Sequence, residues 1–343
     1  MTDQNSNKTP INTDDKTANP SLSFKNRIDL TNLQQSYSSI KKELSKVIIG
    51  QSDFVELLMV ALLTDGHVLI EGVPGIAKTI TAKLFAKTLQ TDFSRIQFTP
   101  DLMPSDVLGT SIVDLKTSEF VFKKGPVFSN IILIDEINRA PAKTQAALFE
   151  VMEEKQITMD GVRYVMEPPF MVLATQNPIE QEGTYTLPEA QLDRFLFKIK
   201  VTYPTFADEV EILKLHHERT VKDPLELIDA VLDIDKLLEY RDKVQQVFIE
   251  EKLLQYIAEI VTKTRSHPHL YLGGSPRASI AIMKSAKAFA AIDGRDFATP
   301  EDIKKSVAPV MRHRVIVSPE REMEGMTEEK VMQLILQSIE IPR

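Results

Sequence analysis

Apolar runs with the length of β-strands alternate with helical periodicities between residues 67 and 201. The strand-length runs lie at 67–70, 94–98, 131–134, 170–174 and 195–201. The run at 131–134 has no polar alternation, which is typical of a strand buried on both faces of a parallel sheet. Apolar residues at helical spacing after Thr79 and after Pro141 predict helices between the strands. We therefore predict an α/β fold, with a parallel five-stranded sheet sandwiched by helices.

Two β-hairpins are predicted among these elements. Asp160-Gly161 separates two short segments and is a strong signal for a two-residue hairpin turn. The other hairpin is expected to have its tip at residues 116–118. The paired segments are 110–113 with 120–122, and 156–159 with 162–165.

The composition limits the class of protein. Of the 343 residues, 43% are hydrophobic, which is ample for a large core. The net charge of −8 does not favour a strongly nucleic-acid-binding surface, and the lack of cysteine excludes disulfides and thiolate metal sites. The polar residues 1–27 hold no signal-like apolar stretch, and no run approaches the ~18 apolar residues of a membrane span. We expect a soluble cytoplasmic protein with a disordered tail.

Residues 71–79 carry the clearest chemistry. Between a strand and a helix they read Glu-Gly-Val-Pro-Gly-Ile-Ala-Lys-Thr, the layout of a phosphate-binding P-loop. Gly72 and Gly75 let backbone N–H groups turn toward phosphate oxygens, and the helix N-terminus adds partial positive charge. Lys78 is expected to reach the β- and γ-phosphates, and Thr79 to ligate Mg²⁺. The alternative is a chance glycine-rich turn, which the flanking strand and helix disfavour.

One position departs from the P-loop pattern. Ala77 stands where such loops usually have glycine. Alanine suits the right-handed region at a helix start and keeps its N–H, so we expect the phosphate cradle to survive. Taken alone, the motif indicates nucleotide binding and no more.

The regions on either side of the predicted sheet are helical. Residues 29–65 predict two helices joined by the apolar turn 47–51. That turn is either an adenine-binding wall or a plain helix connection, and spacing does not separate these alternatives. Beyond Pro204 the periodicity is helical, and no convincing strand is visible. The expected organisation is a polar tail (1–28), an α/β core (29–204) and a smaller all-helical domain (205–343).

Polar residues follow two of the predicted strands. Asp135 and Glu136 end the buried strand at 131–134. In P-loop enzymes an acid at this place binds Mg²⁺, and Glu136 is the candidate to polarise a water for attack on the γ-phosphate. Asn177 closes the next strand, at the sheet edge where ligands bind, and is a candidate to orient that water. The alternatives are a solvated turn for the two acids and an ordinary Asn-Pro turn for Asn177.

Two arginines are candidates for contact with phosphate. Arg194 precedes the last strand and is either a surface ion-pair residue or a finger supplied to a neighbouring subunit. Arg277 opens a helix behind Gly-Gly-Ser-Pro and is a candidate to touch the γ-phosphate from the second domain. The six histidines show no metal-binding spacing, so we expect them to be structural.

Together these motifs resemble the AAA+ ATPases, and within them the MoxR family. The resemblance covers residue 30 to the C-terminus and leaves the tail outside. It rests on segments 71–79 (Walker A), 131–141 (Walker B with Asn-Arg-Ala-Pro), 174–195 (sensor 1 and arginine finger), and 274–278 with 311–314 (sensor 2 and lid).

The resemblance implies ATP as the nucleotide, with Mg²⁺, and a role for each site residue. It implies that the C-terminal domain is a lid and that Asn177 is sensor 1, Arg194 the arginine finger and Arg277 sensor 2. Arg139 is the alternative to Arg194 as the residue acting across an interface. The implied catalytic residues are Lys78, Glu136, Asn177 and Arg194, and the implied metal ligands are Thr79 and Asp135. The implied ATP-binding residues are Ile48, Gly50, Gln51, Gly72, Val73, Pro74, Gly75, Ile76, Ala77, Lys78, Thr79 and Arg277.

The resemblance also implies a hexameric ring that remodels partner proteins, often beside proteins with von Willebrand factor A domains. The sequence itself does not decide between a hexamer and a heptamer. The hairpins would then lie near the pore or the upper face of the ring. A DNA-dependent motor or loader is the alternative, although the acidic balance and a single cation, Arg163, in the 156–165 hairpin disfavour it. A nucleotide-gated binding module without turnover is a third alternative, against which Glu136 argues.

Overall fold

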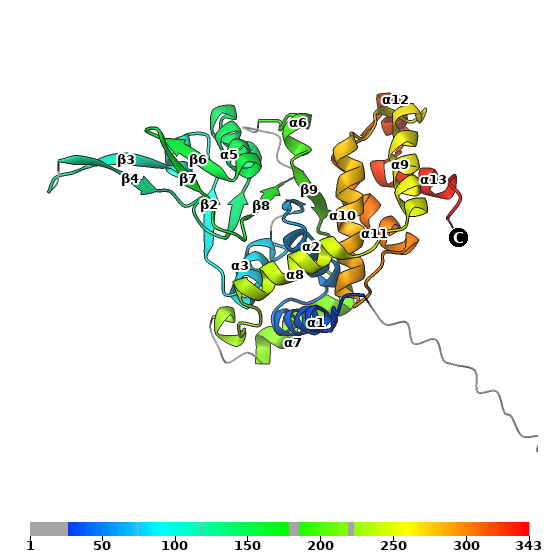
Figure 1. Cartoon of the computed structure of the whole chain (residues 1–343), viewed down its shortest axis with the longest axis horizontal. Helices are drawn as coiled ribbons and strands as arrows, with labels where there is room; N and C mark the ends of the chain where they lie inside the picture. Colours follow the sequence, from blue (N-terminus) through cyan, green and yellow to red (C-terminus); the bar gives the residue numbers. More distant parts are fainter. Residues whose placement is uncertain (1–26, 74, 117, 178–184, 219–222, 343) are drawn as a thin grey trace, which may run out of the picture.

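The computed structural model describes residues 27–73, 75–116, 118–177, 185–218 and 223–342. Its centre is a sheet of five parallel strands in the order β2-β5-β8-β1-β9 (Figure 1). The strands are β1 (His67–Glu71), β2 (Phe93–Gln97), β5 (Ile131–Asp135), β8 (Met171–Gln176) and β9 (Phe195–Lys200). The predicted five-stranded parallel sheet is confirmed. The predicted tail lies, as far as residue 26, outside the described residues.

Helices cover both faces of the sheet, and alternate residues of the central strands β1, β5 and β8 enter two separate apolar clusters. On β5, Ile131 and Leu133 join the cluster of α1 to α3, whereas Ile132 and Ile134 join that of α5. All four side chains are fully buried, which explains the lack of polar alternation in this run. These helices are α1 (Thr31–Ser45), α2 (Ser52–Leu63), α3 (Lys78–Thr88), α4 (Pro104–Leu108) and α5 (Ala142–Glu154).

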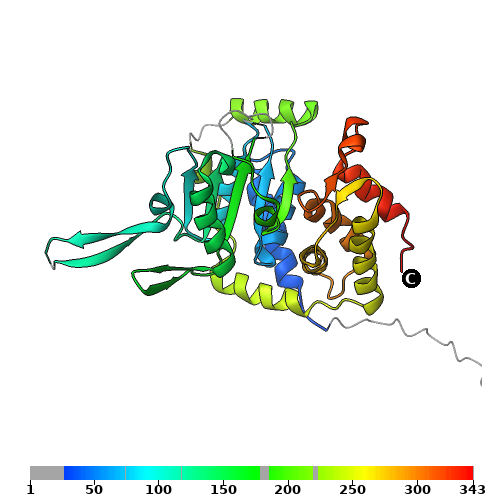
Figure 2. The ribbon, with the colours of Figure 1, turned by 90° about the horizontal axis from the view of Figure 1, so that it is seen from above.

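Two β-hairpins project from the core on the side away from the C-terminal helices (Figure 1; Figure 2). They are β3 (Gly109–Asp114) with β4 (Glu119–Lys124), and β6 (Gln156–Met159) with β7 (Val162–Val165). The hairpins contact each other, since the Ser111 hydroxyl bonds the Asp160 carboxylate and the rings of Phe122 and Tyr164 lie 4.6 Å apart. Both predicted hairpins are confirmed, although Thr117 at one tip lies outside the described residues.

The chain beyond Pro204 is mainly helical, with one correction. β10 (Leu270–Leu272) and β11 (Ile316–Val317) form a short antiparallel pair, so the expectation of no strand in this region is wrong. Strands of three and two residues are too short to show a period of two. The helices of this region are α7 (Phe206–Glu218), α8 (Ile234–Gln246), α9 (Glu251–Ser266), α10 (Pro276–Ile292), α11 (Pro300–Met311), α12 (Pro319–Met323) and α13 (Glu328–Gln337), with a 3-10 turn at Pro224–Leu227. Before Pro204, the short helix α6 (Glu189–Leu192) precedes β9, and a 3-10 turn spans Ile137–Arg139.

The C-terminal helices dock onto β9, an edge strand of the sheet. The buried guanidinium of Arg314 pairs with the Asp193 carboxylate at 2.6 Å and donates to the backbone carbonyls of Asp193, Phe195 and Leu196. His313 bonds the Phe195 carbonyl at 2.9 Å. These contacts cover an edge that would otherwise present unpaired carbonyl groups.

Replacing Arg314 is expected to loosen this docking. Because Arg314→Ala leaves the Asp193 carboxylate without its charged partner and removes a donor from several buried carbonyls, we expect the free energy of unfolding to fall by about 3 kcal/mol. Urea unfolding measures this change. Arg321→Ala is the control, because Arg321 pairs with Glu324 on the exposed surface. Equal stability of the two variants would contradict the docking role of Arg314.

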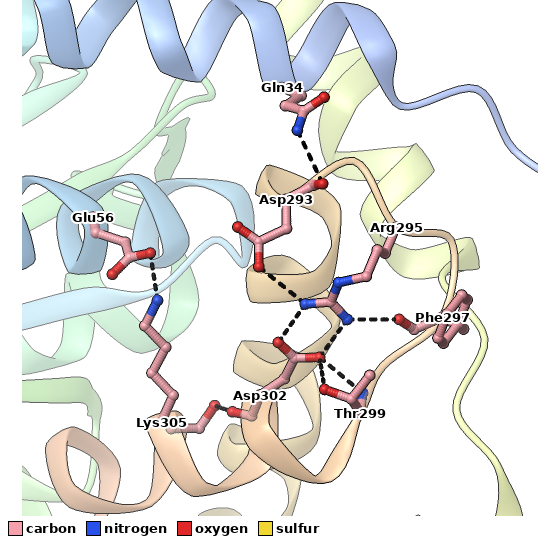
Figure 3. Close-up of polar contacts among 9 residues, drawn as sticks. Gln34, Glu56, Asp293, Arg295, Phe297, Thr299, Asp302 and Lys305 are labelled. Atoms are coloured by element: carbon pink, nitrogen blue, oxygen red, sulfur yellow. Dashed lines mark hydrogen bonds and ion pairs between the residues drawn. The ribbon is translucent and has the colours of Figure 1, made fainter.

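A polar cluster closes the connection between α10 and α11 (Figure 3). Arg295 donates from both terminal nitrogens to the Asp302 carboxylate, at 2.8 and 2.7 Å. Asp302 also accepts from the N–H and hydroxyl of Thr299, which forms the N-terminal cap of α11. One turn later, Lys305 pairs with Glu56 of α2 at 2.6 Å. These contacts join the C-terminal helices to the helices that cover the sheet.

His67 is buried at the first residue of β1 and has a structural role, as predicted. Its Nδ1 accepts from the Val172 N–H at 3.0 Å, which leaves Nε2 to donate to the Met152 carbonyl at 3.2 Å. Burial is the main cause that lowers the pKa of His67 to about 4. The imidazole is therefore neutral in the folded protein at neutral pH.

Stability is expected to fall as the pH falls through the window between the two pKa values of His67. The unfolded histidine, with a pKa near 6.5, binds a proton in this window that the folded one does not bind. We expect His67 to account for a loss of about 2 kcal/mol between pH 7.5 and pH 5. Urea unfolding at both pH values checks this, with exposed His217→Gln as the control. If His67→Gln kept the full pH dependence of the wild type, another group would be responsible.

Candidate active site

The segment 71–79 lies where predicted, between the carboxyl end of β1 and the start of α3. Gly75 has a φ of +84° and open space at its Cβ position, so the loop turns sharply there. Ala77 also has positive φ, +62°, and precedes the first residue of α3. The expectation of a right-handed Ala77 is therefore wrong, because the turn into the helix needs the left-handed conformation that glycine adopts freely. Pro74 lies outside the described residues.

The side chain of Lys78 folds back onto the P-loop. Its ammonium donates to the carbonyl of Gly72. Burial lowers the pKa of Lys78, and the negative charges of Asp135 and Glu136 oppose that shift. The first N–H groups of α3 have no acceptor within the helix, and no acidic residue occupies its first turn. Lys78, Thr79 and the helix start therefore form a site that suits a phosphate group.

The two acids at the end of β5 are held by side chains from neighbouring strands. Thr175 of β8 contacts both, because its hydroxyl donates to Asp135 at 3.3 Å and accepts from the Glu136 N–H at 3.0 Å. Arg95 of β2 pairs with the Asp135 carboxylate at 2.6 Å. Asp135 is only 7% exposed, whereas the side chain of Arg95 is 54% exposed, so a buried carboxylate meets a guanidinium at the surface.

The carboxylate of Glu136 has two further neighbours. Gln97, the last residue of β2, donates to it at 2.9 Å, and Arg139 pairs with it at 3.0 Å. Glu136 itself has a φ of +58°, a conformation that is unusual for a residue with a side chain. The carboxylate is thus directed by contacts on both sides rather than solvated freely.

Asn177 lies next to the P-loop, as the sequence predicted. It follows β8, whose Gln176 carbonyl accepts from the Gly72 N–H at 3.4 Å. Asn177 is 9% exposed, so it is not part of a solvated turn. The residues after it, 178–184, lie outside the described ranges.

A cavity of about 610 Å³ adjoins the P-loop. Its walls come from the turn after α1, from residues 75–77 and from α7, with apolar surface from Ile48, Ile49 and Leu213. The volume lies within the ~300–1,000 Å³ that is usual for small-ligand pockets. The turn 47–51 is therefore more than a helix connection, because it forms one side of a pocket whose other side is the phosphate loop.

Gln51 and Gly50 have different places in this turn. Gln51 donates to the Ile76 carbonyl at 2.8 Å and so ties the turn to the P-loop. Gly50 lies outside the cavity walls and has a φ of +73°. A Cβ on Gly50 would lie 2.8 Å from the Asp208 carboxyl carbon, so a larger residue would displace that side chain and would also adopt an unfavourable positive φ.

The two candidate arginines lie together at the opposite edge of the sheet. Arg194 immediately precedes β9, whose first residue pairs with His67 at the start of β1. Arg194 donates to Glu153 of α5 at 3.2 Å, and Arg277 donates to the same carboxylate at 2.9 Å. The five residues of β1, about 13 Å, separate this edge from the P-loop. The structure therefore places Arg277 with Arg194 and not beside the phosphate loop of its own chain.

The residues present fit a nucleotide and Mg²⁺. The cradle at α3 offers N–H donors and an ammonium, and the cavity offers apolar walls for a base. The hydroxyl of Thr79 and the carboxylate of Asp135 are hard oxygen ligands of the kind that Mg²⁺ takes. The Arg95 pair shows that the Asp135 carboxylate already accepts a cation at this position.

Several residues of this site were not predicted from the sequence. Arg95, Gln97 and Thr175 contact the acids, and α7 lines the cavity although it falls beyond the predicted boundary at 204. Position at the end of a β-strand was the one available signal for Gln97 and Thr175. Glu153 had no signal, because exposed glutamates on helices are common.

Fold and site together define a P-loop nucleotide-binding protein. The family model for the ATPase family associated with various cellular activities matches residues 67–197, and the model for the AAA lid domain matches residues 262–335. Within the described residues, no helix is long and apolar enough to span a membrane.

Full-length relatives narrow this class. The chain is 45% identical to the YeaC protein of Bacillus subtilis, over 88% of this chain and 93% of that protein. It is 42% identical to the chaperone MoxR1 of Mycobacterium tuberculosis, over 88% and 81%. The crystal structure of a proposed ATPase from Cytophaga hutchinsonii is 41% identical, covers 91% and 97% of the two chains, and superposes with a TM-score of 0.84. The chain belongs to the MoxR family of AAA+ ATPases.

Proposed function

We propose that this protein is a chaperone that hydrolyses ATP between the subunits of a ring and uses the reaction to remodel partner proteins. The observation that carries this proposal is the separation of the site into two halves. The P-loop and both acids lie at one edge of the sheet, whereas Arg194 and Arg277 lie at the other. A head-to-tail interface would bring these halves together, and closure of such interfaces by rotation makes a ring.

In this proposal each described residue at the P-loop edge has a task. The apolar cavity holds the adenine ring, while Lys78 and the start of α3 hold the β- and γ-phosphates. Thr79 and Asp135 hold Mg²⁺, which supplies charge neutralisation at the phosphate oxygens. Glu136 accepts a proton from the attacking water, and Asn177 orients that water. Arg95 must leave Asp135 for the metal to bind, and Glu136 must turn from Arg139 or Gln97 toward the water.

The same placement favours Arg194 over Arg139 as the residue that acts across the interface. Arg139 pairs with Glu136 of its own chain, 3.0 Å away, at the P-loop edge. Arg194 lies at the remote edge; its side chain is 29% exposed and that of Arg139 is 35% exposed, so position and not exposure distinguishes the two. A finger must reach a neighbour, and a residue at the remote edge of the sheet can do so in a head-to-tail ring.

The hairpins are the proposed contact with client proteins. Their exposed apolar residues include Leu115 and Phe120 on the longer hairpin, which are 92% and 77% exposed. Exposed apolar surface of this kind suits non-polar segments of another protein. We further propose that the ring is a hexamer, that it is located in the cytoplasm, and that one of its partners has a von Willebrand factor A domain. The name of the mycobacterial relative, a chaperone, agrees with it.

The proposal predicts that ATP hydrolysis depends on protein concentration. Specific activity should rise steeply as the protein is concentrated and should coincide with a ring-sized species in the presence of ATP, because each site needs two chains. Turnover and light scattering measure both, with Lys78→Ala as the blank. Constant specific activity from a monomer would mean that the site is complete in one chain, and the ring proposal would fail.

A further inference from the structure

One carboxylate joins the two arginines at the remote edge of the sheet. Glu153, in the last turn of α5, accepts from Arg194 Nη1 through Oε2 at 3.2 Å and from Arg277 Nη2 through Oε1 at 2.9 Å. Arg194 also donates to the Phe149 carbonyl at 2.8 Å, one turn earlier in the same helix. Glu153 therefore connects a guanidinium from the α/β core with one from the first turn of α10.

We propose that Glu153 is a positioning residue that aligns Arg194 and Arg277 as a pair for the phosphates of a nucleotide bound by the neighbouring subunit. This inference rests on the proposed function, since it needs a site shared by two chains. Glu153 lies on α5 and is not one of the residues already described at the P-loop, at the end of β5 or as a candidate arginine.

Electrostatics explains why an acid is needed between the arginines. Two guanidinium groups held close together repel each other, and a carboxylate bonded to both offsets that repulsion. The triad keeps a net charge of +1, which still attracts phosphate. Each guanidinium has five N–H donors, so contacts through one terminal nitrogen leave donors for phosphate oxygens. Glu153 can thus hold both groups in place without blocking them.

The exposure of the three side chains indicates that the contacts of Glu153 with Arg194 and Arg277 contribute little to the stability of the fold. The side chains of Glu153, Arg194 and Arg277 are 39%, 29% and 53% exposed. Ion pairs with such exposure contribute little to folding. The docking of the C-terminal helices rests instead on the buried pair of Arg314 and Asp193. A variant of Glu153 should therefore fold and assemble, and its defect should appear in turnover.

The first test compares Glu153→Gln with Glu154→Gln, its exposed neighbour on a different face of α5, at protein concentrations that saturate assembly. We expect Glu153→Gln to lower kcat by about 10-fold to 10²-fold, as misplaced groups do. The KM for ATP should change little, because the arginines stabilise charge that develops in the transition state. Adding Glu153→Gln to the double variant Arg194→Ala/Arg277→Ala should cause no further loss. The proposal would be overturned if Glu153→Gln kept the wild-type kcat, or if Glu154→Gln lowered kcat equally. It would also be overturned if the loss vanished at higher protein concentration, or if it added fully to the loss caused by Arg194→Ala/Arg277→Ala.

The second test mixes subunits to separate this inference from the proposed function. Arg194→Ala subunits retain the P-loop, and Lys78→Ala subunits retain the arginines, so a shared site predicts regained ATP hydrolysis in the mixture. When Lys78→Ala/Glu153→Gln replaces Lys78→Ala as the arginine donor, we expect at least a several-fold smaller gain. Absence of any gain in the first mixture would overturn the shared site. Equal gains in both mixtures would overturn the role of Glu153 alone.

Discussion

Replacing Glu136 by glutamine is expected to reduce ATP hydrolysis by about 10²-fold to 10⁴-fold, which is the contribution of a general base. In this structure the substitution changes the charge of the side chain and little of its shape. Glutamine keeps the length of the side chain and still accepts from Gln97, while it loses the negative charge that takes a proton from water. Glu136 lies beside the phosphate loop, since it and Asp135 both act electrostatically on Lys78.

Nucleotide binding separates this loss from a general defect. Glu136→Gln should bind ATP about as tightly as the wild type, because the cradle at α3 and the cavity are unchanged, whereas Lys78→Ala should bind it more weakly. Equilibrium binding of a fluorescent ATP analogue, beside phosphate release, measures both properties. Similar slow turnover in the wild type and in Glu136→Gln would contradict a catalytic role and would favour a nucleotide-gated switch.

Replacing Arg194 by alanine is expected to lower turnover by about 10³-fold in the assembled protein, as loss of an arginine finger does. ATP binding by the same chain should persist, because Arg194 lies a full β-strand away from its own P-loop. Phosphate release at saturating protein concentration, together with nucleotide binding, checks both statements.

Arg163→Ala is a matched control for Arg194→Ala. Arg163 lies on the β6–β7 hairpin, and its replacement removes the same charge at a different place. It should leave basal hydrolysis within about two-fold, the ordinary outcome for surface substitutions. If Arg194→Ala retained normal turnover while Arg139→Ala lost it in assembled protein, Arg139 would be the better candidate for the finger.

The central sheet and the P-loop edge of the site were predictable from the sequence, because both depend on short-range patterns. The run Ile131–Ile134 without polar alternation requires burial on two faces, and Asp135 directly follows it. Parallel strands end at a common edge, so the strand ends predicted that Asp135 and Asn177 would gather at the P-loop. The hairpin at Asp160-Gly161 is equally local, because its turn type follows from two residues.

Other features needed the tertiary structure. The sequence left open whether the turn 47–51 is more than a helix connection, and only the tertiary structure brings it together with residues 75–77 and α7 around one cavity. The left-handed conformation of Ala77 at the entry to α3 runs against the local preference of alanine for the right-handed region. The β10–β11 pair joins segments more than forty residues apart, and each strand is too short for a periodic signal.

The place of the arginines is the clearest case. The sequence identified Arg194 and Arg277 as separate candidates, one beside a strand and one at a helix start. The course of α5 back across the sheet brings Glu153 to both of them, and the docking of Arg314 on Asp193 brings α10 to the same edge. Periodicity describes which face of an element is buried, whereas the meeting of two domains at one carboxylate depends on packing between distant segments of the chain.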